Sequence, residues 1–116
     1  MMASSSHHIY VIELDPQVWR DKKKFRDANP HYRHRLECLY VGITARLPQE
    51  RIIQHLHGGK SKKGINLSSS LVRKYGLYLR PTLYQHLNPL TRKRAVLLEK
   101  SLAESLRLRG YAVWWN

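Results

Sequence analysis

The apolar positions of the chain fall in short runs that are separated by polar and charged intervals. Residues 8–14 and 36–43 are rich in Ile, Val, Leu and Tyr, and runs of this composition and length predict two β-strands. Between them, residues 15–35 are polar and strongly charged, which predicts an insertion or a long hairpin connection with a short helix around residues 18–26. Because strands that follow one another in sequence usually pair antiparallel, we expect these two strands to do so.

Helical spacing of the apolar residues begins after the second strand. Pro48 suits the first turn of a helix, where its missing N–H is not required. Aliphatic residues give this helix one apolar side, and the paired glycines at 58–59 are expected to end it. Ser68 is typical of the N-cap of a second, short helix that ends at Gly76.

The C-terminal part of the chain predicts one more strand and the longest helix. Residues 77–87 predict a third strand, in which Pro81 requires an edge position or a bulge. Thr91 is expected to cap the longest helix, which ends at Gly110 and is followed by an apolar segment at residues 111–115. The predicted order of elements is therefore β-β-α-α-β-α, which is typical of a small α+β domain.

Composition limits the chain to one domain and indicates its partner. The 116 residues suffice for a single modest core, so we assign residues 1–116 to one domain. The chain has 21 Lys and Arg residues against 8 Asp and Glu residues, a net charge of +13. A folded chain this basic usually binds a polyanion, and nucleic acid is the commonest one. An anionic membrane fits less well, because no helical pattern sets the cations opposite an aromatic and aliphatic face.

Cysteine content and the start of the chain narrow the cellular setting. Cys38 is the only cysteine, which excludes an intramolecular disulfide and a cysteine metal site. The first residues lack the apolar core of a signal peptide, and no apolar stretch is long enough to span a bilayer. We therefore expect a cytoplasmic protein.

Several clusters of cations lie in predicted loops or at predicted helix ends. Such clusters neutralise backbone phosphates without reading sequence, although each cluster taken singly could be an ordinary solvated surface. Their number, against so few acids, favours nucleic-acid binding. The residues concerned are Lys22, Lys23, Lys24, Arg33, Arg35, Lys60, Lys62, Lys63, Arg73 and Lys74.

One carboxylate falls on the apolar side of the last helix. Ala95, Leu98 and Leu102 recur at helical spacing and define that side. Glu99 lies four residues after the first and three before the last, so it shares their side. A charge there is costly unless it is paired or binds a cation. The sequence leaves both explanations open, a salt bridge with one of the many arginines or a metal ligand.

Four further residues could join this carboxylate in one site. Arg51 and His55 are one helical turn apart, so a phosphate-binding guanidinium and a proton-accepting imidazole can face the same pocket. Tyr10 and Tyr40 lie at the centres of the first two predicted strands. Taken singly, the first pair could be a solvated helix face and the tyrosines could belong to the core. Together with Glu99, they favour a site that binds one divalent metal and acts on a phosphodiester.

The order of these residues resembles that of the GIY-YIG nucleases. The segments His-Ile-Tyr at 8–10 and Tyr-Val-Gly at 40–42 resemble the two half-motifs of that family. Residues 51–56 resemble its arginine helix, and Glu99 begins a segment that resembles its metal-binding helix. Asn116 falls where the family has a late asparagine, which would steady the site by hydrogen bonding.

The resemblance implies a fold and an activity. The fold is a small α+β domain with a central three-stranded antiparallel sheet flanked by helices, and the activity is hydrolysis of DNA phosphodiester bonds with one Mg²⁺ or Mn²⁺. By this resemblance Tyr10, assisted by Tyr40 or His55, would help to deprotonate the attacking water. Arg51 would hold the scissile phosphate and Glu99 would bind the metal.

This chain departs from the family pattern in three places, and other classes of function stay open. His8 stands in place of the family's first glycine, and the polar insertion at residues 15–35 lengthens the interval between the half-motifs. The interval from Glu99 to Asn116 is also long. A non-catalytic module that binds DNA or RNA on a nuclease-derived fold is the main alternative to a DNA endonuclease. A ribosome-associated structural protein is a third. Sequence specificity is expected from the insertion, from homodimerisation or from a partner protein.

Overall fold

Four short strands form one mixed sheet in the part of the chain that the structure describes. The structure is a computed structural model and describes residues 5–57 and 70–115, without the side chains of residues 55–57. The sheet order is β3-β1-β2-β4. The strands are β1 (His8–Leu14), β2 (Cys38–Thr44), β3 (Gly76–Leu79) and β4 (Ala112–Trp115). The predicted α+β class is therefore confirmed.

The first two strands form the centre of the sheet. They pair antiparallel along their whole length, from His8 opposite Thr44 to Leu14 opposite Cys38. Nearly every side chain in both strands is buried, because helices cover the sheet on both sides. The predicted pairing of the two apolar runs is confirmed.

The expectation of a three-stranded antiparallel sheet is wrong, because β4 adds a fourth strand parallel to β2. A parallel partner requires a long crossover, and the 17-residue helix α5 (Arg92–Leu108) that precedes β4 supplies it. The predicted third strand at residues 77–87 is also too long. It ends at Leu79, and Pro81, which has no N–H for a ladder, begins the first of two short 3₁₀ turns.

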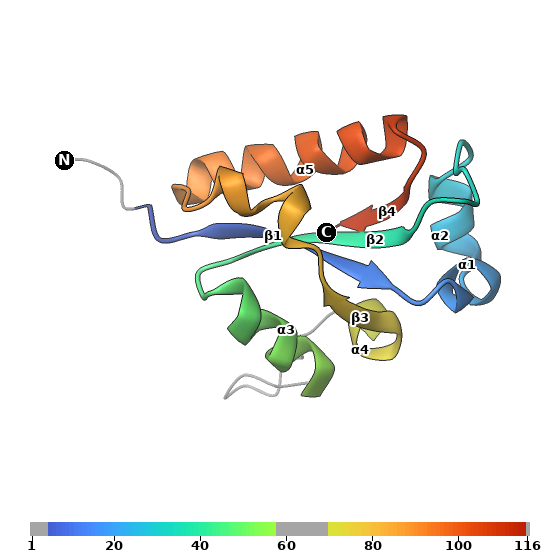
Figure 1. Ribbon diagram of the computed structural model, residues 1–116, viewed down its shortest axis with the longest axis horizontal. Coiled ribbons are helices and arrows are strands. Elements are labelled where there is room, and N and C mark those ends of the chain that lie inside the picture. Colours follow the sequence, from blue (N-terminus) through green and yellow to red (C-terminus); the bar gives the residue numbers. More distant parts are fainter. Residues whose placement is uncertain (1–4, 58–69, 116) are drawn as a thin grey trace.

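The helices lie on both sides of the strands and at one end of them (Figure 1). The helix α5 runs along one side, whereas α3 (Pro48–His57) and α4 (Ser70–Tyr75) lie on the other. Thr91 caps α5 as predicted, accepting a hydrogen bond from the backbone N–H of Arg94. The predicted cap at Ser68 and the glycines at 58–59 lie outside the described residues.

The polar interval at residues 15–35 folds into two short helices, α1 (Gln17–Asp21) and α2 (Lys23–Ala28), where a single helix was predicted. Asn29 anchors the end of this segment to the outer edge of the sheet. Its side-chain oxygen accepts hydrogen bonds from the backbone N–H of Val113 at 2.7 Å and from Arg107 at 3.0 Å. The interval is therefore an integral part of the fold. Through Asn29 it gives a hydrogen-bond partner to the outer edge of β4, where no described strand pairs.

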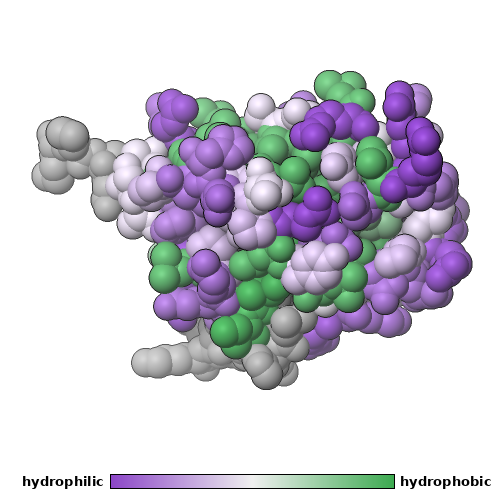
Figure 2. Space-filling view, in the orientation of Figure 1, coloured by the Kyte–Doolittle hydropathy of each residue, from purple (hydrophilic) through white to green (hydrophobic). Residues whose placement is uncertain are grey.

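The surface of the described residues is mainly hydrophilic. On the face drawn in Figure 2, polar and charged side chains cover most of the area, and apolar side chains gather toward α3 and β3. Ile53 and Leu77 are among the exposed apolar residues of these two elements. No helix within the described ranges is both long and apolar enough to span a bilayer.

Candidate active site

The structure brings the two predicted tyrosines together on neighbouring strands. Tyr10 lies opposite Gly42 in the ladder, and Tyr40 lies opposite Ile12. The two rings therefore stand two positions apart on one face of the sheet, with their centroids 6.3 Å apart. Each side chain is only 1% exposed. Both tyrosines thus belong to the core as well as to the candidate site.

Gly42 leaves the space that the Tyr10 ring occupies. A Cβ atom at position 42 would overlap the phenol oxygen of Tyr10 and would lie 2.5 Å from the ring carbon Cζ, closer than non-bonded carbons approach. The glycine of the Tyr-Val-Gly segment is therefore required by the packing of the tyrosine of the His-Ile-Tyr segment. This contact is a physical link between the two segments that their spacing in the sequence alone did not reveal.

We expect Gly42→Ala to displace the Tyr10 phenol and to destabilise the fold by about 1–3 kcal/mol, the usual cost of overpacking a core. Urea unfolding of the variant measures this loss. Tyr10→Leu removes the overlapping ring, so the cost of Gly42→Ala should shrink in the Tyr10→Leu background. Purely additive effects of the two substitutions would contradict the proposed contact.

Arg51 extends from α3 toward this tyrosine pair. Its side chain is partly buried, and one of its guanidinium nitrogens donates a hydrogen bond to the side-chain oxygen of Gln54. The guanidinium also lowers the pKa of the Tyr10 phenol, through its charge and through hydrogen bonding. No carboxylate forms an ion pair with Arg51 in the described part of the chain. Its charge is therefore available to an anion such as a phosphate.

The surroundings of Tyr10 keep its phenol protonated. Burial raises its pKa most strongly, and the neighbouring Tyr40 adds to the effect, while the Arg51 guanidinium partly opposes it. The negative charge of Glu99 on α5 makes the smallest contribution and raises the pKa of Tyr10 further. Tyr10 is therefore a hydrogen-bond donor at neutral pH, poorly suited to act alone as a base.

Glu99 is partly buried, and burial raises the pKa of its carboxyl to about 7. Among the described residues, no hydrogen bond or ion pair satisfies this carboxyl, so no arginine there fulfils the salt-bridge alternative. By contrast, Glu104, further along the same helix, is exposed and lies 3.9 Å from Lys100. A half-buried carboxylate that no described residue pairs is suited to binding a cation.

A metal at Glu99 would depend on few protein ligands. The described residues contain no group of three or more His, Cys, Asp and Glu side chains that could hold an ion. Mg²⁺ does not require such a cage, because it keeps several waters and commonly uses one or two carboxylates together with substrate phosphates. Glu99 fits this limited role, and a tightly bound structural metal does not fit these residues.

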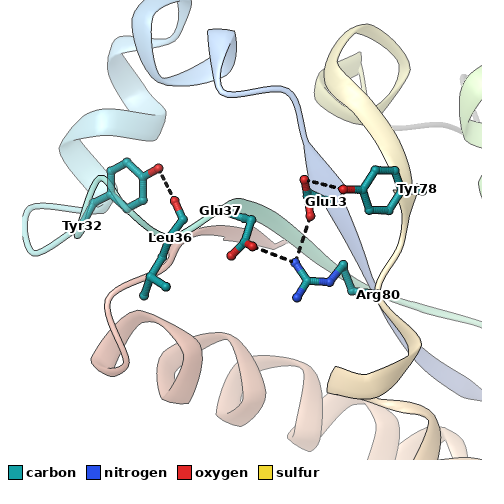
Figure 3. Close-up of polar contacts among 6 residues, drawn as sticks. All are labelled: Glu13, Tyr32, Leu36, Glu37, Tyr78 and Arg80. Atoms are coloured by element: carbon teal, nitrogen blue, oxygen red, sulfur yellow. Dashed lines mark hydrogen bonds and ion pairs between the residues drawn. The ribbon is translucent and has the colours of Figure 1, made fainter.

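A second set of carboxylates is already neutralised within the fold (Figure 3). Glu13 accepts hydrogen bonds from Tyr78 at 2.8 Å and from Arg80 at 2.9 Å, and the same guanidinium nitrogen lies 3.5 Å from Glu37. These contacts fasten the chain after β3 to β1 and to the start of β2. The sequence analysis missed this group, although a lone Glu inside the first apolar run was a signal for it.

Several predicted site residues lie partly or wholly outside the described structure. His55 belongs to α3, one turn after Arg51, but its side chain is not among those described. Asn116 lies outside the described residues, as do the predicted cations Lys60, Lys62 and Lys63. Their contributions stay predictions.

The remaining predicted cations are all exposed, but they do not form one continuous cluster. Lys23 pairs with Asp27 at 2.6 Å on the surface of α2, which removes part of its attraction for phosphate. Four others, from α2, its N-cap and α4, line one cavity that is described below. The exposed residues are Lys22, Lys23, Lys24, Arg33, Arg35, Arg73 and Lys74.

Comparisons with known proteins add no further constraint on the class of protein. No protein-family model matches the chain, and neither a curated protein nor a solved structure matches it significantly. The class that the fold and site define is thus an α+β domain with a buried tyrosine pair, an arginine and a glutamate that no described residue pairs.

Proposed function

We propose that this protein is a divalent-metal-dependent endonuclease that hydrolyses DNA phosphodiester bonds, with a site similar to that of the GIY-YIG nucleases. The observation that carries the proposal is a separation of charge around Tyr10. A guanidinium and a carboxylate both act on the pKa of this phenol, and neither forms an ion pair within the described residues. A cation on α3 and an anion on α5 that no described residue pairs fit a substrate that supplies a phosphate and a metal together.

Each side chain has a separate task in this proposal. The Arg51 guanidinium holds the scissile phosphate and offsets the charge that develops on it. The Tyr10 phenol, kept protonated by burial, donates a hydrogen bond that orients the attacking water or a phosphate oxygen. Glu99 would hold Mg²⁺ or Mn²⁺, which would supply Lewis-acid stabilisation of the leaving group. The proton of the water passes to His55, or to solvent with the help of Tyr40.

Metal dependence is the direct test of this proposal. We expect the purified chain to cut supercoiled plasmid or a labelled single strand in Mg²⁺ or Mn²⁺, and EDTA should abolish the cutting. Ca²⁺ is a useful control, because its looser coordination usually supports binding without efficient chemistry. Cutting that persists in EDTA, or no cutting of any substrate form in either metal, would contradict the proposal.

A non-catalytic nucleic-acid-binding module is the second candidate. The near-complete burial of Tyr10 and Tyr40 favours it, because a side chain that is 1% exposed does not meet substrate without some rearrangement. The excess of cations supports binding in either case. The two candidates differ in one result, since the binding module retains salt-sensitive binding but shows no metal-dependent cleavage.

A further inference from the structure

A basic cavity lies between the insertion and the rest of the domain. It has a volume of about 780 Å³ and is bounded by α2 with its N-cap, by α4 and by β4. Four cations and two aromatic rings form the greater part of its wall. These residues are Lys22, Lys24, Arg73, Lys74, Phe25 and Trp114.

The positive charge of this cavity is only partly balanced within the described residues. None of the described wall residues is acidic, and none of the four cations forms an ion pair within the described ranges. Asp21, outside the wall, is close enough to Lys74 and Lys22 to offset part of their charge, and the hydrogen bonds that it accepts from Tyr75 and Gln17 leave its own charge in place. Four positive charges around one cavity repel one another. A bound polyanion would therefore reduce this electrostatic repulsion.

The rest of the wall is apolar and aromatic. Phe25 is buried, whereas Trp114 is partly exposed and so offers part of its ring to the cavity. Trp114 also lies opposite Tyr40 in the parallel ladder, so the cavity adjoins the tyrosine pair along the sheet. A nucleotide matches both features, because its phosphates pair with the cations and its base stacks on an indole ring, whereas the headgroup of an anionic lipid offers no aromatic ring.

We propose that this cavity binds one unpaired nucleotide of a nucleic-acid strand, with the base against Trp114 and the flanking phosphates among the four cations. A base within a duplex is stacked on its neighbours and cannot reach such a ring, whereas single strands stack readily on aromatic side chains. The volume is in the range of ordinary ligand sites, about 300–1,000 Å³. This inference rests on the proposed function and names its substrate class, nucleic acid with an unpaired segment.

The test is a binding measurement in EDTA, so that cleavage plays no part. Fluorescence anisotropy with a labelled 12-nucleotide thymidine strand compares the wild type with Arg73→Ala/Lys74→Ala. The matched control, Arg92→Ala/Lys93→Ala, removes two exposed cations from the start of α5. We expect the cavity variant to bind about tenfold more weakly and the control about twofold more weakly at physiological salt. Equal losses in both variants would overturn the proposal.

The role of the base is tested with the unaltered protein. A strand of the same length with abasic sugars keeps every phosphate but offers no ring for Trp114, and we expect it to bind about tenfold more weakly. A fully paired duplex should also bind more weakly than the thymidine strand. Equal affinity for the three ligands, or preferential binding to anionic vesicles, would overturn the assignment.

The binding tests of the cavity and the cleavage test of the proposed function can succeed or fail independently. Loss of affinity in the cavity variant without any cleavage by the wild type in Mg²⁺ would support the cavity and contradict the nuclease. Metal-dependent cleavage without a preference for unpaired strands would support the nuclease and contradict the assignment of the cavity. Thermal unfolding of both double variants verifies that the comparison is made between folded proteins.

Discussion

Glu99→Gln is expected to fold more stably than the wild type at neutral pH and to lose nearly all cleavage. The loss should be roughly 1,000-fold, equivalent to about 4 kcal/mol of transition-state stabilisation, because the amide does not hold the divalent metal with a negative charge. The gain in stability comes from the loss of the same negative charge. The amide removes the cost of ionising a partly buried carboxyl whose pKa lies near 7. Allowing for solvent screening of this partly exposed group, the gain is about 1 kcal/mol.

The gain in stability should depend on pH in a defined way. The pKa of Glu99 is raised from 4.5 in the unfolded chain to about 7 in the folded protein. Below pH 4.5 both states are protonated and the variant has no advantage. Between these pH values the unfolded chain releases the proton first, so the wild type loses stability relative to Glu99→Gln as the pH rises. Above pH 7 the difference is constant.

Urea unfolding of the two proteins in EDTA from pH 4 to pH 8 measures this difference without any metal. Glu104→Gln is the matched control, because it makes the same change on an exposed residue of the same helix. It should alter neither cleavage nor the pH dependence of stability. A Glu99→Gln variant that is less stable than the wild type at pH 8 would show that the carboxylate has a partner within the fold.

Arg51→Lys is expected to lower the cleavage rate at saturating DNA by about 100-fold while affinity changes little. The substitution keeps a positive charge but removes the planar guanidinium, which can donate two parallel hydrogen bonds to two oxygens of a phosphate. It also loses the fixed position that Gln54 gives the guanidinium. Single-turnover cleavage measures the rate, and anisotropy in EDTA measures the affinity.

Arg46→Lys supplies the control for this prediction. Arg46 is an exposed arginine shortly before α3. The same substitution there should leave the rate within about twofold of the wild type, as expected for a solvated cation. If Arg51→Lys weakened binding in proportion to its loss of rate, Arg51 would contribute general electrostatic attraction and not stabilisation of the reacting phosphate.

The strands of this protein were predictable to different degrees for physical reasons. The bounds of β1 follow directly from the apolar run at residues 8–14, since Asp15 and Pro16 end it sharply. β4 was not predicted as a strand, because four apolar residues after a helix do not indicate which strand, if any, they pair with. Its parallel pairing with β2 depends on the path of α5, which is a property of the whole chain.

The candidate site was predictable as a set of residues but not as a set of interactions. The order of Tyr10, Tyr40 and Arg51 in the sequence was sufficient to expect them near one another. The lack of an ion pair at Glu99 within the described residues could not be predicted from the sequence. The chain contains many arginines, and the directions of their side chains depend on tertiary packing. The contact of Gly42 with the Tyr10 phenol likewise requires the register of the two strands.

The basic cavity was beyond sequence analysis altogether. Lys22 and Lys24 come from the insertion, whereas Arg73 and Lys74 come from α4, far along the chain. Each pair alone has the composition of an ordinary solvated surface. The tertiary fold brings the two pairs together, and a hydrogen bond from Tyr75 to Asp21, at 2.7 Å, joins α4 to α1 beside them.

The most direct measurement of the central claim is single-turnover cleavage of a labelled strand and of supercoiled plasmid by the wild type, Glu99→Gln and Glu104→Gln. The three proteins are purified identically and assayed in Mg²⁺, in Mn²⁺ and in EDTA. We predict metal-dependent cleavage by the wild type and Glu104→Gln at similar rates, and a loss of roughly 1,000-fold in Glu99→Gln. Equal cleavage by all three proteins, or none by the wild type, would contradict a metal-dependent nuclease site at Glu99.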